Sequence, residues 1–300
     1  MARRYVVLCG GLGGSRFVDA LARAAGPADV VAVGNVGDDL EFLGLHVSPD
    51  LDTVLYTLAG LLDEGRGWGV QDESYNALGM AERLGAETWF TLGDRDIGLH
   101  LVRSAQLRDG RPLSAVAAEL TERLGIGVRL LPASDDPIRT KILTHDGELD
   151  FQDWFVRRRH ADAITGVRYD GAEVARAAPG VAEAIAAAEV VFLAPSNPFV
   201  SILPIVAVRE IRAALERQRV VALSPLVGGR ALRGPLVEML RALGHEASAA
   251  AVRELYGDLV TTFLVDPADA ATAGAVVCPI VMVDPDRREA VGRAVLEAVA

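Results

Sequence analysis

Lysine, cysteine and suitably spaced histidines are scarce in this chain, and each shortage argues against a class of site. Lys141 is the only lysine among 300 residues, so no glycine-rich turn here is followed by the lysine that a Walker loop requires. Cys9 and Cys278 are the only cysteines and lie in apolar runs far apart in the sequence. This favours buried free thiols and a reducing compartment over a disulfide. The five histidines show neither H-x-H nor H-E-x-x-H spacing, so we expect neither a zinc site nor a histidine-based catalytic triad.

Long apolar runs and an excess of positive charge are also absent from the sequence. No apolar run reaches 18 residues, so we expect no membrane span. Ala2-Arg3-Arg4 leads directly into an apolar run, which predicts that no signal peptide is present. The formal net charge of −11 argues against general affinity for nucleic acid or anionic membranes. With a hydrophobic content of 51%, these features predict a globular, cytoplasmic protein with a sizeable core.

Apolar, β-branched runs alternate with helical patterns along most of the chain. The predicted strands are residues 5–9, 29–34, 87–92, 127–131, 189–194, 219–224, 260–265 and 279–283. The predicted helices are residues 15–25, 51–63, 73–84, 113–124, 205–217, 233–243 and 285–299. Continuous apolar strands that alternate with amphipathic helices indicate an α/β fold, in which a mostly parallel sheet is covered by helices on both faces.

This alternation breaks in one segment of the chain. Residues 141–151 predict a hairpin with its turn at Asp146-Gly147, and an aromatic cluster and a basic run follow it. We interpret the segment as a smaller α+β subdomain inserted into the core. The predicted division is 1–134 for the first part of the core, 135–185 for the inserted subdomain and 186–300 for the second part of the core.

A glycine-rich turn joins the first predicted strand to the first predicted helix. It contains Gly10, Gly11, Gly13, Gly14 and Ser15. Glycines let a backbone approach a polyphosphate closely, and the helix N-terminus offers unpaired N–H groups and a partial positive charge. The spacing differs from the dinucleotide fingerprint G-x-G-x-x-G, because Arg16 stands at the third glycine and the second predicted strand ends in Asn35 rather than in an acidic residue. The turn therefore predicts a phosphate site of neither standard type, with a ligand-free turn as the alternative.

Polar clusters follow the predicted strands. They are Gly10–Ser15, Asn35 with Asp38 and Asp39, Leu92–Asp96 just after Thr91, Ser134–Pro137 and Ala194–Pro198. Ligands of such sheets bind at the C-terminal strand ends, where these loops converge, although each cluster alone also fits ordinary turn and cap chemistry. The candidate binding residues in the later clusters are Asn35, Thr91, Arg95, Ser134, Ser196 and Asn197.

Carboxylates dominate these clusters and a further one, Ser48–Thr53, which opens a predicted helix. Oxygen-only clusters suit Mg²⁺ that is bound through one or two carboxylates plus substrate phosphates. Asp50 and Asp52 are the strongest candidates, because a helix N-terminus can hold a carboxylate rigidly; helix capping without a ligand is the alternative. The amide of Asn197 has the donors and acceptor needed to contact a purine base edge or a ribose.

Taken together and in order, these motifs resemble the 2-phospho-L-lactate transferase family of coenzyme F-420 biosynthesis. The matching stretches are residues 10–15 (GGLGGS), 48–56 (SPDLDTVLY), 68–70 (WGV), 92–96 (LGDRD), 131–137 (LPASDDP), 151–153 (FQD), 195–198 (PSNP) and 224–229 (SPLVGG). The long S-P-D-L-D-T-V-L-Y and L-G-D-R-D strings are far more specific than any glycine turn. The resemblance covers nearly the whole chain and implies a Rossmann-like, doubly wound core with a smaller inserted domain, usually in a homodimer.

The resemblance also implies a reaction. A guanylyl diphosphodiester, lactyl- or enolpyruvyl-diphospho-5'-guanosine, passes its 2-phospholactyl or phosphoenolpyruvyl group to the ribityl hydroxyl of the deazaflavin Fo. GMP leaves, and Mg²⁺ assists. The arginine- and alanine-rich composition is similar to that of the actinobacterial branch of the family, whose donor is the enolpyruvyl compound.

Carried onto this chain, the family's reaction would use the residues singled out above. The diphosphate would lie on Gly10–Ser15 and Asn35, and guanosine on the Ser196–Pro198 turn. The metal and acceptor region would contain Asp39, Asp50 and Asp52. Because attack of an alcohol on phosphorus needs mainly alignment and charge neutralisation, one of the last two would align the hydroxyl or accept its proton. On that hypothesis Asp52→Ala abolishes GMP release and leaves the fold intact.

Two alternatives remain at this point. A non-catalytic regulator of the same superfamily that binds nucleotide sugars would share the glycine turn, but S-P-D-L-D-T and L-G-D-R-D together favour the transferase. An NAD-dependent oxidoreductase is suggested by the opening strand and helix alone, and Arg16 and the missing strand-end acid argue against it. In all three cases we expect residues 64–76, with several glycines and Trp68, to form a mobile flap over the site.

Overall fold

A seven-stranded parallel sheet forms the centre of the protein, as the alternating pattern predicts. The computed structural model describes residues 5–300, so the predicted approach of residues 2–4 to the first strand lies outside the described residues. The strands of the sheet are β1 (Tyr5–Cys9), β2 (Val30–Gly34), β5 (Arg129–Pro132), β9 (Val190–Leu193), β10 (Val220–Leu223), β13 (Thr262–Val265) and β14 (Val276–Val277). Their spatial order is β14-β13-β10-β9-β1-β2-β5, and every neighbouring pair is parallel.

This strand order determines where a ligand can enter. The chain runs outward from β1 through β2 to β5, returns to the other side of β1 as β9, and then runs outward again. In open sheets of this kind, ligands bind beyond the carboxyl ends of the strands, at the point where the direction reverses. The gap between the ends of β1 and β9 is therefore the expected site, and the Rossmann-like, doubly wound fold class is confirmed.

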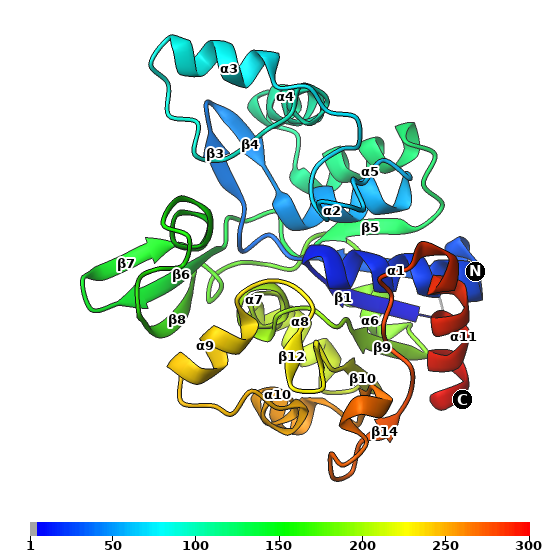
Figure 1. Cartoon of the computed structure of the whole chain (residues 1–300). Helices are drawn as coiled ribbons and strands as arrows, with labels where there is room; N and C mark the ends of the chain where they lie inside the picture. Colours follow the sequence, from blue (N-terminus) through cyan, green and yellow to red (C-terminus); the bar gives the residue numbers. More distant parts are fainter. Residues whose placement is uncertain (1–4) are drawn as a thin grey trace.

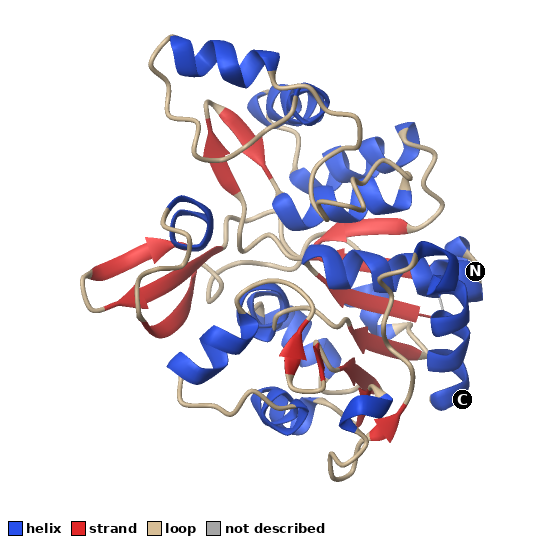
Figure 2. Cartoon of the chain, in the orientation of Figure 1, coloured by secondary structure: helices blue, strands red, loops and turns tan. Residues whose placement is uncertain are grey.

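Helices cover both faces of the sheet (Figures 1 and 2). On one face α1 (Gly11–Ala25) packs against α2 (Pro49–Leu58) and α11 (Arg288–Ala298), and α5 (Leu113–Arg123) packs on β5. On the other face α6 (Val181–Ala186) packs against α8 (Arg209–Leu215). The inner strands are buried along their whole length, which explains why they are continuous apolar runs rather than alternating ones.

The chain between β2 and β5 forms a small lobe above the sheet in Figure 1, of which the sequence patterns predicted only the helix at 73–84. It consists of the antiparallel hairpin β3 (Leu40–Phe42) and β4 (Leu45–Val47) with α3 (Asn76–Arg83) and α4 (Asp94–Arg108). Its own apolar cluster contains Phe42, Val47, Leu78 and Leu92, with Trp89 and Phe90 packed against it. The prediction of a strand at 87–92 was wrong, because these aromatic residues pack into the lobe as irregular chain and pair with no other strand. The polar cluster that follows therefore opens α4 rather than ending a strand.

The inserted subdomain contains a three-stranded antiparallel sheet of order β7-β6-β8. Its strands are β6 (Arg139–Thr144), β7 (Gly147–Asp150) and β8 (Ile164–Asp170), and a short π-helix (Asp153–Arg157) follows β7. The predicted hairpin is confirmed, since Thr144 pairs with Gly147 around the turn. Helix α6 lies in the same range of the sequence but packs with the helices of the main sheet.

The C-terminal part completes the sheet with short elements. They are a π-helix (Pro198–Ile202), α7 (Leu203–Val206), β11 (Leu226–Val227), β12 (Arg230–Ala231), α9 (Leu236–Ala242) and α10 (Ala249–Tyr256), with 3-10 turns at Pro27–Asp29, Gly257–Leu259, Pro267–Asp269 and Pro285–Arg287. The strand predicted at 279–283 was wrong: the edge strand is β14, and 279–283 runs as irregular chain with Ile280 and Met282 buried. Within residues 5–300, no helix is both long and apolar enough to span a bilayer.

Candidate active site

A cavity of about 770 Å³ opens at the point where the strand order reverses. It lies between the start of α1, which follows β1, and the turn Pro195–Asn197, which follows β9. Helix α2, the lobe and the inserted subdomain add further walls. Residues that line it include Gly10–Gly13, Arg16, Asp38, Asp50, Asp52, Tyr56, Gly67–Gly69, Phe90, Thr91, Asp96, His100, Phe151, Gln152, Phe155, Pro195–Asn197, Ala231–Leu236, Ile280 and Met282.

The glycines of the first turn are required by close packing. A Cβ on Gly10 would lie 2.1 Å from Asp50 Oδ2, and one on Gly13 would lie 2.4 Å from the carbonyl oxygen of Pro195. Gly11 has a positive φ of 59°, which favours glycine. The turn therefore draws α1, α2 and the loop after β9 together at one point.

The N-terminus of α1 is partly occupied by the protein itself. The Gly11 amide donates to Asp50 Oδ1 at 2.6 Å. Leu12 and Gly13 also lie in the first turn and line the cavity, and their amides have no acceptor among the described residues outside the helix. Since free N–H groups at a helix N-terminus attract anions, these two amides remain available to a phosphate.

Asp50 and Asp38 form a buried acidic pair in the cavity wall. The Asn35 amide nitrogen donates to Asp50 Oδ2 at 2.9 Å and lies 3.3 Å from Asp38 Oδ1, and Gln152 donates to Asp38 Oδ2 at 3.1 Å. Burial raises the pKa of Asp50 to about 6, although hydrogen bonds from Asn35 and the Gly11 amide oppose the shift. Burial and the nearby charge of Asp50 raise the pKa of Asp38 as well. No arginine or lysine of the described chain pairs with either carboxylate, so the pair lacks a neutralising cation.

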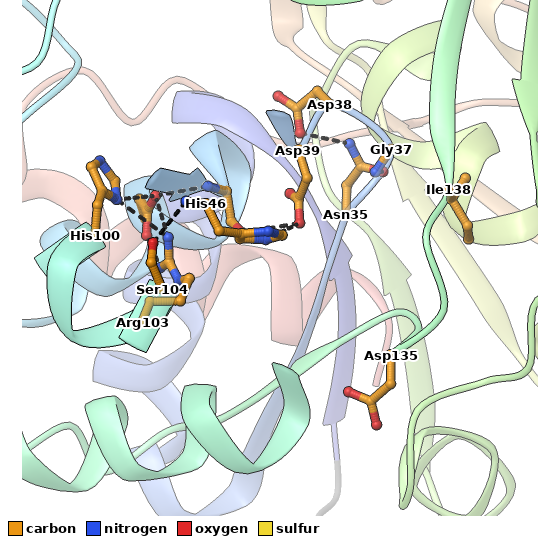
Figure 3. Close-up of polar contacts among 12 residues, drawn as sticks. Asn35, Gly37, Asp38, Asp39, His46, His100, Arg103, Ser104, Asp135 and Ile138 are labelled. Atoms are coloured by element: carbon orange, nitrogen blue, oxygen red, sulfur yellow. Dashed lines mark hydrogen bonds and ion pairs between the residues drawn. The ribbon is translucent and has the colours of Figure 1, made fainter. Parts of the chain in front are cut away.

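Asp39 points toward His46, whereas Asp38 points toward Asn35 (Figure 3). Asp39 Oδ2 accepts from the hydroxyl of Ser48 at 3.0 Å and lies 3.1 Å from His46 Nε2. Its Oδ1 is buried without a partner in the described chain. Asp39 does not line the main cavity but faces a smaller hollow of about 400 Å³ between the lobe and the inserted subdomain.

Asp52 is held by an arginine that the sequence patterns did not single out. Both of its oxygens accept from the guanidinium of Arg103 on α4, and both residues are buried. Desolvation opposes the charge of Arg103, but Asp52 keeps the pKa of the guanidinium above its ordinary value. This ion pair connects α2 to α4 and so connects the main sheet to the lobe.

His100, Asp96 and Tyr56 continue this network along the cavity wall. His100 Nδ1 lies 3.8 Å from Asp52 Oδ2, and His100 Nε2 lies 3.0 Å from Asp96 Oδ1. The Tyr56 hydroxyl donates to Asp96 Oδ1 through a short hydrogen bond. Burial and the charges of Asp52 and Asp96 raise the pKa of this tyrosine. Sequence reasoning named Asp96 only as part of the Leu92–Asp96 cluster and did not single out Tyr56, and it missed His100 because α4 was not predicted. The spacing of Asp96, His100 and Arg103 on one face of a helix is the signal that could have connected them.

The turn after β9 contributes Ser196 and Asn197 to the cavity. The Ser196 hydroxyl donates to the Gly10 carbonyl at 2.7 Å, which locks this turn to the glycine turn. Asn197 Oδ1 caps the following π-helix by accepting from the Phe199 amide at 3.0 Å. Its amide nitrogen lies 3.4 Å from the Met239 sulfur, a weak acceptor.

The remaining predicted site residues divide between the cavity and its surroundings. Thr91 lines the cavity, whereas Gly14, Ser15, Asn35, Arg95 and Ser134 do not. Ser15 is buried against Leu12 and Thr57, and Ser134 Oγ donates to the Arg176 carbonyl. Arg95 lies on the surface and donates to the Gln71 carbonyl. Its placement near the site depended on the strand at 87–92, which does not form.

Comparison with known proteins places the chain in a family. The model of the family described as "2-phospho-L-lactate transferase CofD" matches residues 5–298. The chain belongs to this family. It is 46% identical over 312 residues to a phosphoenolpyruvate transferase of Streptomyces avermitilis, covering 98% of this chain and 97% of the relative. Proteins of the same name from Thermobifida fusca and Mycolicibacterium smegmatis are 43% and 41% identical, each covering 98% of this chain.

Solved structures support the fold separately. A member of the UPF0052 family from Bacillus halodurans superposes with a TM-score of 0.57 at 17% identity, covering 88% of this chain and 80% of that protein. At this identity the likeness shows the fold alone. Membership of the transferase family shows that the chain is an enzyme. It is a transferase of coenzyme F-420 biosynthesis, the pathway that the sequence motifs indicated. It also favours this activity over the regulator and the oxidoreductase.

Proposed function

We propose that the protein transfers a phosphoenolpyruvyl group from enolpyruvyl-diphospho-5'-guanosine to the ribityl hydroxyl of the deazaflavin Fo and releases GMP. The observation that best supports the proposal is the acidic pair Asp38–Asp50. It lies beside the N-terminus of α1, at the point where the strand order of the sheet reverses. The names of the relatives favour the enolpyruvyl donor over the 2-phospholactyl one.

The two substrates fit different walls of the cavity. The diphosphate would lie on the free amides of Leu12 and Gly13, and guanosine beside Ser196 and Asn197. The flat ring of Fo would lie on the opposite side, where Phe90, Phe151 and Phe155 line the cavity. The ribityl chain would then lie beside the acidic pair, with its hydroxyl directed at the phosphorus.

The donor set of the cavity suits Mg²⁺ bound jointly with substrate. Within residues 5–300, no three acidic, histidine or cysteine side chains are grouped to hold a metal on their own. Asp38 and Asp50 supply two carboxylates without a cation, and Mg²⁺ is commonly held by one or two carboxylates plus substrate phosphates. Asp52 does not suit this role because Arg103 occupies both of its oxygens. We therefore assign the metal to Asp38 and Asp50, where it would neutralise charge on the transferred phosphate.

The protein's own part in the chemistry is alignment and proton acceptance. The hydroxyl oxygen of Fo bonds to the phosphorus that carries the enolpyruvyl group, and the bond from that phosphorus to the bridging oxygen breaks. The bridging oxygen leaves with GMP, and the hydroxyl proton passes to a carboxylate. Burial raises the pKa of Asp50 to about 6 in the metal-free protein, so its carboxylate is still ionised at neutral pH and available to bind Mg²⁺ and to align the hydroxyl.

The assembly and location of the enzyme belong to the same proposal. We expect a homodimer, as the family resemblance implies, with partners limited to the two substrates rather than nucleic acid or membrane. Cys9 and Cys278 are free and buried, which suits the reducing cytoplasm.

The test is turnover with defined substrates. Purified protein is mixed with Fo, Mg²⁺ and either enolpyruvyl- or lactyl-diphospho-5'-guanosine, and GMP and the deazaflavin product are separated by chromatography. GMP should appear in step with the Fo adduct, faster with the enolpyruvyl donor. Asp50→Asn should abolish release, whereas the matched surface variant Asp170→Asn should not alter it. Absence of GMP with both donors would refute the proposal.

A further inference from the structure

Arg16 lies on the cavity wall with part of its hydrogen-bonding capacity unused. It is one turn into α1 from the glycine turn, is 8% exposed and lines the cavity. Its Nη2 donates to Glu64 Oε2 at 2.8 Å. Its Nε is buried and has no partner among the described residues. A buried guanidinium N–H is costly to leave unpaired, so this geometry points to an acceptor that enters the cavity from outside.

Glu64 orients this guanidinium and is itself held from a second side. Its Oε1 accepts from Arg288 Nη2 on α11, and Arg288 is buried against Asp19 and the Met282 carbonyl. Burial opposes ionisation of Glu64, yet hydrogen bonds from Arg288 and Arg16 hold its pKa below the ordinary value. Because Arg288 also neutralises Glu64, Arg16 can share its charge with a ligand without leaving the glutamate unpaired.

Glu64 also belongs to a loop that lines this part of the cavity. We call residues 62–70 the cover loop. Its ends are joined by a bridge between Leu62 and Val70, and Gly67, Trp68 and Gly69 line the cavity. On its other side, Arg233 donates to the carbonyls of Gly65 and Arg66. Arginines from two different elements thus contact the cover loop, and Arg16 is the one on α1, about one turn beyond the amides of Leu12 and Gly13.

The charges around the cavity show why an anion needs Arg16. Four carboxylates line the cavity, those of Asp38, Asp50, Asp52 and Asp96, and one of them is neutralised by Arg103. Arg16 and Arg233 are the arginines of the described chain that line it, and Arg233 is engaged with carbonyls. A diphosphate at the start of α1 would lie within reach of Arg16, whose planar guanidinium forms charge-assisted hydrogen bonds with phosphate oxygens.

We propose that Arg16 binds the diphosphate of the nucleotide donor through its free N–H groups, and that Glu64 positions it and couples this contact to the cover loop. The proposal rests on the proposed function for the identity of the donor, but not for the class of ligand, which is a diphosphate. Occupation of the site would hold Arg16 between phosphate and Glu64 and so fix the cover loop, with Trp68, over the bound donor.

Calorimetry with inorganic pyrophosphate and with GDP, at fixed Mg²⁺, tests the binding role. Arg16→Gln should weaken both ligands by about 10- to 100-fold, because a charge-assisted contact is lost, and should leave guanosine binding unchanged. Arg16→Lys should recover only part of the affinity, since an ammonium group cannot serve phosphate and Glu64 together in the same geometry. The matched control Arg123→Gln, on the exposed end of α5, should bind as the wild type. If Arg16→Lys or a folded Arg16→Gln binds pyrophosphate as tightly as the wild type, the proposal is wrong.

Tryptophan fluorescence tests the coupling through Glu64. Pyrophosphate should shift the emission of the wild type, and Trp68→Phe should remove that shift. Glu64→Gln should keep measurable binding by calorimetry but lose most of the shift, which a merely structural role would not predict. A full shift in Glu64→Gln would overturn the coupling. Wild-type protein that binds pyrophosphate through Arg16 but releases no GMP would instead contradict the proposed function and leave this inference standing.

Discussion

At the residue scale, the aspartates at the start of α2 differ in function because their neighbours differ. Asp50 faces the Gly11 amide and Asn35, both uncharged donors. Asp52, half a turn further along, faces the guanidinium of Arg103. The first carboxylate is therefore left without a cation, whereas the second is neutralised within the protein.

The raised pKa of Asp50 predicts a stability that depends on pH. Between its ordinary value of 3.8 and about 6, the unfolded chain releases a proton that the folded chain keeps, so stability falls as the pH rises through this window and stays lower above it. Asp50→Asn removes this loss and should gain about 1–3 kcal/mol relative to the wild type between pH 4 and pH 7. Urea unfolding over this range, without Mg²⁺, measures the difference.

Asp170 provides the control, because a hydrogen bond from Arg168 lowers its pKa. Asp170→Asn should show no gain above pH 6. An offset between Asp50→Asn and the wild type that is the same at pH 4 and pH 7 would contradict the assignment of a raised pKa.

The buried pair Asp52–Arg103 changes the outcome expected for a substitution at Asp52. Arg103→Met and Asp52→Ala each leave a buried charge unpaired and should cost about 3–5 kcal/mol of unfolding free energy. The double variant Asp52→Leu/Arg103→Met should recover most of that loss, because apolar side chains of similar size can replace a buried ion pair. Denaturant unfolding of the three variants gives the comparison.

The same double variant separates structure from chemistry. Since Asp52 positions α4 in our assignment, the refolded double variant should keep GMP release within about tenfold of the wild type. A stable but inactive double variant would show that the carboxylate of Asp52 itself acts on substrate. The expectation from the sequence that Asp52→Ala leaves the fold intact took no account of Arg103. This partner of Asp52 lies 51 positions further along the chain.

Other site residues show what local patterns can and cannot predict. The position of the glycine turn and of Asp50 followed from their place after a strand and at a helix start, which are local features. The pairing of Asp38 with Asp50 through Asn35 depends on how β2 and α2 pack, and no spacing in the sequence encodes it. Arg16 was noted only as an interruption of a fingerprint, although its neighbours now give it a binding role in our proposal.

At the element scale, the glycines of α1 set how closely three elements approach. A Cβ on Gly13 would meet the Pro195 carbonyl at 2.4 Å, and the backbone there cannot yield as a flexible side chain would. Gly13→Ala should therefore destabilise the fold by about 1–3 kcal/mol and widen the gap between β1 and β9. Thermal unfolding and the affinity for pyrophosphate should both decrease.

Gly98 in α4 is the matched control, because a Cβ there meets nothing within 4 Å. Gly98→Ala should stabilise the protein by about 0.5–1 kcal/mol, as alanine usually does in a helix interior. If Gly13→Ala is as well tolerated as Gly98→Ala, close packing is not the reason for glycine in this turn.

The elements that were predicted wrongly share a physical cause. Residues 87–92 contain three large apolar side chains and residues 279–283 form an apolar run, but these apolar side chains pack in the lobe or at the cavity wall instead of in a sheet. A short apolar run does not specify what it packs against. The inner strands β1, β2 and β9 were predicted correctly because both of their faces are buried, which leaves a longer and less ambiguous apolar run.

At the scale of the whole molecule, the main sheet and the lobe have separate apolar cores that meet at the cavity. The lobe core is small and rests largely on aromatic contacts, in which the Phe42 ring lies 5.3 Å from Trp89 and 5.9 Å from Phe90. The adjoining Phe90 and Thr91 line the cavity. Loosening this core should therefore disturb one wall of the cavity while the sheet stays intact.

Phe42→Ala tests this division. The substitution should cost the lobe about 3–5 kcal/mol, and hydrogen exchange should accelerate in α3 and α4 but not in β1 and β9. Because the proposed Fo wall moves while the acidic pair does not, KM for Fo should rise more than kcat falls. Phe192→Ala, which removes an equivalent aromatic contact with Phe17 at 5.5 Å in the main core, should instead accelerate exchange throughout the chain. Uniform acceleration in Phe42→Ala would mean that the lobe and the sheet unfold as one unit, and the cavity would then be a cleft within a single core rather than a junction of two.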